Sequence, residues 1–125
     1  MDYSLARFNM VESQLRTNKV TSLNLIEAMG KIPREKFVPK QISDLAYIDH
    51  DIMVAPGRYI MEPLVLARLL QEASVKKQDV ALDVGCATGY ASAVLGQLAG
   101  TVVGLEEDSN LCDAAAELLN DIGAD

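Results

Sequence analysis

The sequence is poor in the residues and runs that mark metal-binding, secreted and membrane proteins. Its two cysteines, Cys86 and Cys112, form no CxxC pair, and its single histidine, His50, has no cysteine near it. This spacing favours reduced thiols in a cytoplasmic protein and predicts no metal site. No apolar run approaches the roughly 20 residues that cross a bilayer. Residues 1–10 carry no secretory signal pattern, so we expect neither a membrane partner nor secretion.

Basic side chains are missing from the last third of the chain. The net charge is −7, and residues 81–125 hold eight acidic side chains but no Lys or Arg. Because phosphate contacts depend on Lys and Arg, we expect no nucleic acid partner there. Residues 1–40 hold seven basic and four acidic side chains. That excess is typical of a solvated helix surface, with an anionic partner as the alternative.

Apolar periodicity is what the chain has in abundance, since half of its residues are hydrophobic. The predicted helices span residues 2–17, 21–29 and 62–74, with short helical turns between residues 34 and 47. Between them, residues 48–60 contain Pro56-Gly57 flanked by apolar and β-branched residues, which predicts an extended segment with a turn. The first half therefore reads as mainly helical.

Strand and helix patterns alternate in the last third. Val80–Val84 and Thr101–Glu106 predict strands with little polar alternation, as is typical of strands buried on both faces. A helix is predicted after each strand, over residues 90–99 and 109–122. This order indicates a right-handed parallel unit, so the predicted fold class is α/β.

The turn after the first predicted strand is glycine-rich and reads DVGCATGY, residues 83–90. Such a turn presents backbone N–H groups and a helix N-terminus to a ligand. Ala87 stands where the dinucleotide fingerprint has its second glycine, which disfavours a pyrophosphate and hence a nicotinamide enzyme. A P-loop is excluded because no Gly-Lys-Ser/Thr follows.

Two acidic residues mark the ends of the predicted strands. Asp83 ends the first, and Glu106 ends the second 23 residues later, where an acidic side chain accepts hydrogen bonds from a ribose diol. An adenosine ligand with an ammonium group and no phosphates fits both features, and S-adenosylmethionine is such a ligand. The alternative is that Gly85 and Gly89 only form a tight turn and that Glu106 is a charge at a helix start.

Several segments resemble a known family. DVGCATGY followed by VVGLEE is similar to the first two motifs of class I methyltransferases. MVESQLRTNKV, AMGKIPREKFVP, DLAYIDHDI and GRYIMEPLVLARLL resemble the protein-L-isoaspartate O-methyltransferases, so that the resemblance covers roughly residues 8–120. It implies a helical N-terminal subdomain with a substrate-side loop, residues 1–61. The first part of a Rossmann-like methyltransferase parallel sheet then follows in residues 62–125, incomplete at this length.

The resemblance implies transfer of a methyl group from S-adenosylmethionine to an isoaspartyl carboxylate in damaged proteins. In that scheme the cofactor-binding residues are Asp83, Gly85, Ala87, Gly89 and Glu106. The three loop residues surround the amino-acid part of the cofactor, Asp83 orders the loop, and Glu106 binds the ribose hydroxyls. Methyl transfer to a carboxylate is a displacement that depends mostly on positioning, which agrees with a sequence in which no catalytic triad is visible.

Residues 57–63, GRYIMEP, depart from the family pattern, which usually reads G-Q-T-I-S-Q-P. Met61 stands where the family has its serine and cannot donate a hydrogen bond to a carboxylate, so no catalytic residue is assigned. Arg58 and Tyr59 are candidate substrate-binding residues, because the guanidinium fork matches a carboxylate. The alternative places Met61 in an apolar gap and Arg58 in solvent.

Two other functions stay open beside isoaspartyl methylation. One is a non-catalytic homologue that acts as a dimerisation or binding module, and the other is a methyltransferase with a different acceptor. Family members continue through further strands, so we expect either a truncated chain or a half-domain that forms a homodimer through an exposed sheet edge. Met61 and the chain length favour the non-catalytic alternative.

Overall fold

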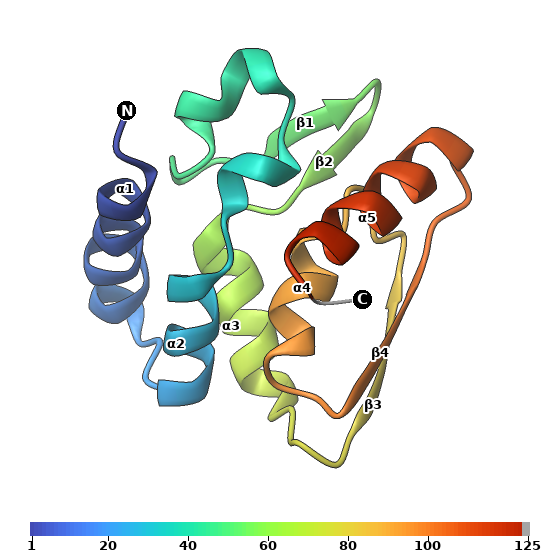
Figure 1. Cartoon of the computed structure of the whole chain (residues 1–125). Helices are drawn as coiled ribbons and strands as arrows, with labels where there is room; N and C mark the ends of the chain where they lie inside the picture. The colour runs from blue at the N-terminus through green and yellow to red at the C-terminus, as the bar shows by residue number, and fades with distance from the viewer. Residues whose placement is uncertain (124–125) are drawn as a thin grey trace.

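The computed structural model describes residues 1–123, in which five α-helices pack beside a hairpin and a parallel pair of strands that lies at the edge of the molecule (Figure 1). The α-helices are α1 (Tyr3–Met10), α2 (Leu23–Lys31), α3 (Pro63–Ala73), α4 (Tyr90–Gly96) and α5 (Ser109–Asp121). Shorter helical segments are η1 (Val11–Leu15), η2 (Arg16–Asn18), η3 (Arg34–Phe37) and η4 (Lys40–Leu45). The strands are β1 (Ile52–Ala55), β2 (Arg58–Ile60), β3 (Val80–Val84) and β4 (Thr101–Leu105). Within residues 1–123, no helix has both the length and the apolar character that crossing a bilayer requires.

The predicted N-terminal helices are confirmed, with two local differences. Helix α1 continues through η1 and η2, but η1 is π-helical, a change that apolar periodicity alone does not signal. Asp2 caps the start of α1 by accepting from the Leu5 amide at 3.1 Å, and Ser22 caps α2. Helix α2 ends at Lys31, two residues past the predicted end at residue 29.

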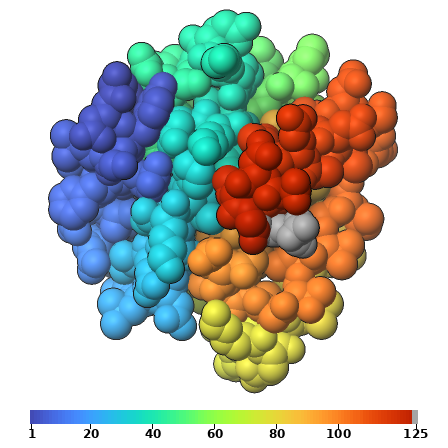
Figure 2. All heavy atoms as spheres, in the orientation of Figure 1, coloured from blue at the N-terminus to red at the C-terminus, as the bar shows by residue number. Residues whose placement is uncertain are grey.

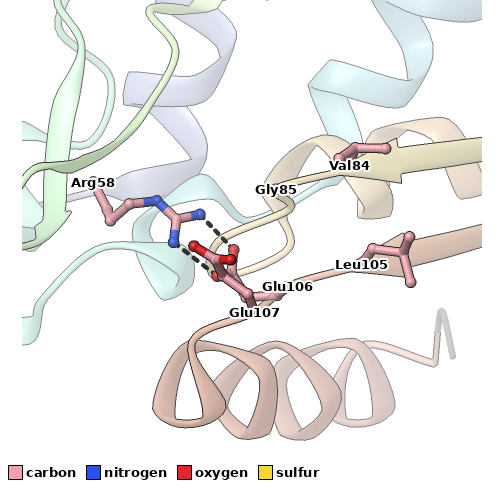
Figure 3. Close-up of a pocket in the computed structure, with 6 residues that line it drawn as sticks. All are labelled: Arg58, Val84, Gly85, Leu105, Glu106 and Glu107. Carbon is pink, nitrogen blue, oxygen red and sulfur yellow. Dashed lines mark hydrogen bonds and ion pairs between the residues drawn. The ribbon is translucent and has the colours of Figure 1, made fainter.

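The predicted extended segment forms an antiparallel β-hairpin. Ile52 pairs with Ile60, and both side chains are buried, which fixes the hairpin against the core. A bulge lies between Met53 and Ala55, and Gly57 turns the chain with a φ of +70°. The hairpin therefore carries Arg58, the first residue of β2, at the tip that approaches the ends of β3 and β4 (Figure 3).

Strands β3 and β4 pair in parallel from Val80 opposite Thr101 to Val84 opposite Leu105, as the strand–helix–strand pattern predicts. Gly104 faces α4, because a Cβ on it would lie 3.1 Å from Ser92 Oγ. The opposite face of the pair is exposed and consists of Val80, Leu82, Val84, Val103 and Leu105. The expectation that both faces are buried is therefore wrong for this chain, since α4 covers only one. The expected pairing of a sheet edge with a second copy stays a prediction.

One cluster of buried side chains runs from Met10 to Leu98 and joins the N-terminal helices to α4. The rings of Phe37 and Tyr90 meet edge to face with their centroids 5.7 Å apart, and Thr88 Oγ1 donates to the Phe37 carbonyl at 2.7 Å. The surface view agrees, since the atoms of residues 30–45 lie directly against those of α5 (Figure 2). The helical first part thus supports the loop that precedes α4.

We predict that Gly100→Ala destabilises the fold. A Cβ at Gly100 would lie 2.4 Å from the Lys77 carbonyl oxygen, a backbone atom that cannot move aside cheaply. The expected loss is on the order of 1–3 kcal/mol in the free energy of unfolding, measured by urea denaturation. Gly96→Ala in α4 is the matched control, because nothing lies within 4 Å of its added Cβ. Equal midpoints for the two variants would contradict the close approach.

Candidate functional site

The loop between β3 and α4 is a tight turn held at the carboxyl end of β4. Gly85, Ala87 and Gly89 all have positive φ, at 73°, 52° and 97°. The amides of Gly85 and Cys86 both donate to the Leu105 carbonyl, at 2.8 and 3.0 Å. Ala87 keeps a conformation that is costly for a residue with a side chain, and its amide is held by Glu106 at 2.8 Å. The loop and the residue after β4 are thus one hydrogen-bonded unit.

Glu106 lies at the centre of this unit, with its side chain only 1% exposed. Its carboxylate accepts from Arg58 Nη1 at 2.7 Å and from Arg58 Nη2 (Figure 3). It also accepts from the amides of Ala87 and Asp108, at 2.8 and 3.0 Å. These bonds, first the one from Arg58, lower the pKa of Glu106 to about 2. Glu106 is therefore ionised at neutral pH, and four donors occupy its two oxygens.

The Arg58 side chain is half-buried, and in this structure it is bound to Glu106 rather than open to a substrate. Its guanidinium forms a two-pronged ion pair with Glu106, and the hydrogen bond to that carboxylate raises the pKa of Arg58. About a third of the Arg58 side chain stays exposed. The pair joins the tip of the hairpin to the end of β4 across 48 residues of sequence.

Two cavities adjoin the loop. A cavity of about 560 Å³ opens at the carboxyl ends of β3 and β4, where ligands bind in parallel α/β sheets. Its walls are formed by Arg58, Val84, Gly85, Leu105, Glu106 and Glu107. A smaller one of about 150 Å³ lies between the hairpin and the loop. Its walls include Tyr59, Met61, Asp83, Gly85, Ala87 and Tyr90.

Most of the expected site residues therefore meet at these two cavities, but Gly89 does not. Gly89 packs against α5 instead, where an added Cβ would lie 3.3 Å from that of Ala115. Asp83 accepts a hydrogen bond from Ser92 Oγ at 2.8 Å, so its carboxylate is bonded to α4 rather than to loop amides. Burial raises the pKa of Asp83. Tyr59 and Met61 are both substantially exposed at the rim.

Sequence reasoning did not single out Arg34 or Ser92. Arg34 is fully buried, donates to the Met61 carbonyl at 3.0 Å and places its guanidinium 4.7 Å from the centre of the Tyr90 ring. Burial lowers the pKa of Arg34 and raises that of Tyr90. Only the apolar neighbours of Arg34 in the sequence could have signalled that it is buried. Across residues 1–123, no three His, Cys, Asp or Glu side chains are grouped to hold a metal ion.

The Arg58–Glu106 pair predicts a pH dependence of stability. The pKa of Glu106 is about 2 in the fold against an ordinary value of 4.5, so the pair stabilises fully above pH 4.5 and its contribution is lost as the pH falls towards 2. Arg58→Gln removes the main cause of the shift. We therefore expect the difference in free energy of unfolding between wild type and variant to shrink between pH 4.5 and 2.5. Arg16→Gln, which removes an exposed ion pair with Glu12, is the control and should follow the wild type. Parallel curves for Arg58→Gln and wild type would contradict the shift.

Comparisons with known proteins place this chain in a family. The family described as "Protein-L-isoaspartate(D-aspartate) O-methyltransferase (PCMT)" matches residues 6–125. The chain is 40% identical to Protein-L-isoaspartate O-methyltransferase 2 of Anaeromyxobacter sp. (strain Fw109-5) over 117 residues, which is 94% of this chain and 48% of that protein. It is 37% identical to the Protein-L-isoaspartate O-methyltransferase of Protochlamydia amoebophila (strain UWE25) over 114 residues, 91% of this chain and 54% of that protein. The chain thus spans about half the length of these curated relatives.

Two solved structures share the fold. One is described as a protein-L-isoaspartate O-methyltransferase and superposes with a TM-score of 0.79 at 22% identity, covering 95% of this chain and 39% of that one. The other is a putative protein-L-isoaspartate O-methyltransferase from Plasmodium falciparum in complex with S-adenosyl-L-homocysteine. It superposes with a TM-score of 0.77 at 21% identity, covering 92% of this chain and 55% of that one.

These likenesses confirm the predicted α/β class with a parallel, Rossmann-like sheet. The family match extends over nearly the whole chain, from the N-terminal helices through the loop to α5. The chain therefore belongs to the protein-L-isoaspartate(D-aspartate) O-methyltransferase family.

Proposed function

We propose that this protein binds S-adenosylmethionine and transfers its methyl group to an isoaspartyl carboxylate of a damaged protein. The observation that carries the proposal is Glu106, an ionised carboxylate at the carboxyl end of β4, held beside a glycine-rich loop and lining a cavity. The family and the relative solved with S-adenosyl-L-homocysteine support the choice of cofactor.

The residues at the cavity fit such a ligand. A volume of about 560 Å³ lies within the usual range of small-molecule sites. Gly85 presents no side chain to the cavity, so a ligand can approach the backbone of the loop. In this proposal Glu106 accepts the ribose hydroxyls, while Gly85 and Ala87 border the amino-acid part. Gly89 contributes by closing the loop on α5, and Asp83 contributes by fixing α4 through Ser92.

Methyl transfer depends mainly on how the two reactants are aligned. S-adenosylmethionine supplies a methyl group on a sulfonium, and the carboxylate oxygen has to meet it in line. Tyr59 and Met61 border the smaller cavity, between hairpin and loop, which we assign to the substrate side. Since Met61 offers no donor, the carboxylate needs another partner there, and strand β2 of the same hairpin supplies the basic side chain of Arg58.

A second function is favoured by the same Met61. Its thioether and the Tyr59 ring give the rim an apolar character where the family usually has a serine and a threonine. This lining suits a methyl acceptor other than an isoaspartyl peptide. It also suits a homologue that binds the cofactor without transferring its methyl group.

Titration of S-adenosylhomocysteine tests the cofactor site. We expect binding in the micromolar range for the wild type and at least about tenfold weaker binding for Glu106→Ala, because the charged acceptor of the ribose is lost. The measurement is isothermal calorimetry, with Glu12→Ala as a control that removes a remote, exposed carboxylate. Equal affinity in all three proteins would rule out the role given to Glu106.

The acceptor is tested by methyl transfer from labelled S-adenosylmethionine to a peptide that contains isoaspartate, against the same peptide with aspartate. We expect transfer to the isoaspartyl peptide alone. Met61→Ser should increase that transfer about five- to a hundredfold, since the serine hydroxyl adds a donor to the carboxylate on the side where Met61 offers none. Cofactor binding without transfer to either peptide, in wild type and variant, would favour a different methyl acceptor or a homologue that does not transfer the methyl group.

A further inference from the structure

The four hydrogen bonds of Glu106 leave no room for a ribose diol. An ionised carboxylate has about four acceptor positions, and here the amides of Ala87 and Asp108 and the two prongs of Arg58 occupy them. The two amides belong to the loop and to the start of α5, and they cannot leave without unfolding these turns. The two N–H groups of Arg58 are therefore the only donors that two ribose hydroxyls can replace.

We propose that Arg58 is a latch on the nucleoside site: it closes the site by pairing with Glu106, and the ribose diol displaces it and frees its guanidinium for the carboxylate of the substrate. This inference rests on the proposed function and adds to it an order of binding, cofactor first and carboxylate second. The exchange is balanced, because two donors on Glu106 are replaced by two others and Arg58 passes from one carboxylate to another.

The position of Arg58 suits such an exchange. It lies at the hairpin tip, next to Gly57, and about a third of its side chain already meets solvent. Rotation of this side chain suffices for release, since the Ile52–Ile60 pair that anchors the hairpin lies at its other end. Among residues 1–123, Glu106 is the only carboxylate that forms an ion pair with Arg58.

Charge explains why the released residue would take up the substrate. Among the described residues that line the two cavities, Arg58 is the only Lys or Arg, and the other charged side chains are those of Asp83, Glu106 and Glu107. Residues 81–125 contribute no basic side chain at all. A substrate carboxylate entering this acidic region needs a cation, and Arg34 cannot serve because it is fully buried. One arginine therefore has to serve both sites in turn.

The first experiment compares the affinity of S-adenosylhomocysteine for the wild type, Arg58→Gln, Arg58→Lys and Arg16→Gln by calorimetry. This ligand lacks the sulfonium charge, so removing a cation does not favour its binding through bulk electrostatics. We expect Arg58→Gln to bind about tenfold more tightly than the wild type, because no bidentate pair has to be broken. Arg58→Lys keeps the charge but not the fork and should lie between them. Arg16→Gln should match the wild type.

The second experiment measures binding of an isoaspartyl peptide by fluorescence anisotropy with and without saturating S-adenosylhomocysteine. We expect the wild type to bind the peptide only when the nucleoside is present, and Arg58→Gln to lose peptide binding while it gains nucleoside affinity. A residue with a merely structural role would weaken both ligands together. Unfolding curves at pH 7 confirm that each variant is folded.

The outcomes separate the latch from the proposed function. Equal or weaker nucleoside binding by Arg58→Gln would overturn the latch and leave the cofactor site standing. Peptide binding that is independent of the nucleoside would overturn the exchange of partners. Absence of nucleoside binding in both wild type and Arg58→Gln at millimolar concentration would overturn the cofactor site and the latch together.

Discussion

A single buried guanidinium holds the three segments that build the site. Arg34 donates to the carbonyls of Ala46 and Met61 and lies against the ring of Tyr90, the first residue of α4. Taking a charge out of water is costly, and this one has no carboxylate partner in the described chain, so the carbonyls and the ring provide its main compensation. The N-terminal helices, the end of the hairpin and the loop before α4 are consequently fixed relative to one another.

The local elements follow from the sequence because their signals are local. Val80–Val84 emerges as a strand at the predicted bounds, since an apolar run between a polar turn and a glycine-rich turn has few alternatives. Asp108, directly before the predicted helix, caps α5 by accepting from the amides of Asn110 and Leu111. By contrast, the π-helical turn at Val11–Leu15 and the exposed face of β3 and β4 depend on what packs against them, which periodicity does not encode.

The candidate site was only half visible in the sequence for the same reason. Glu106 and the loop stand at fixed spacing after two strands, so a strand–helix pattern is enough to bring them together. Arg58 reaches them from a hairpin 48 residues away, and nothing in its neighbourhood signals that partner. In the proposed site the carboxylate that pairs with Arg58 is also the ligand contact, so under that proposal stability and binding compete for the same oxygens.

The contacts of Phe37 with Thr88 and Tyr90 have a consequence for how this protein can evolve. A hydrogen bond and an aromatic pair connect the helical first part to the loop of the sheet. The two parts are therefore not independent modules that recombination could exchange freely. A homologous first half brought in by gene fusion would need a matching ring at the position of Phe37, whereas any residue there offers the backbone carbonyl to which Thr88 donates. Substitutions at Phe37 and Tyr90 should therefore be inherited together, and the helical segment should share the ancestry of the loop it supports.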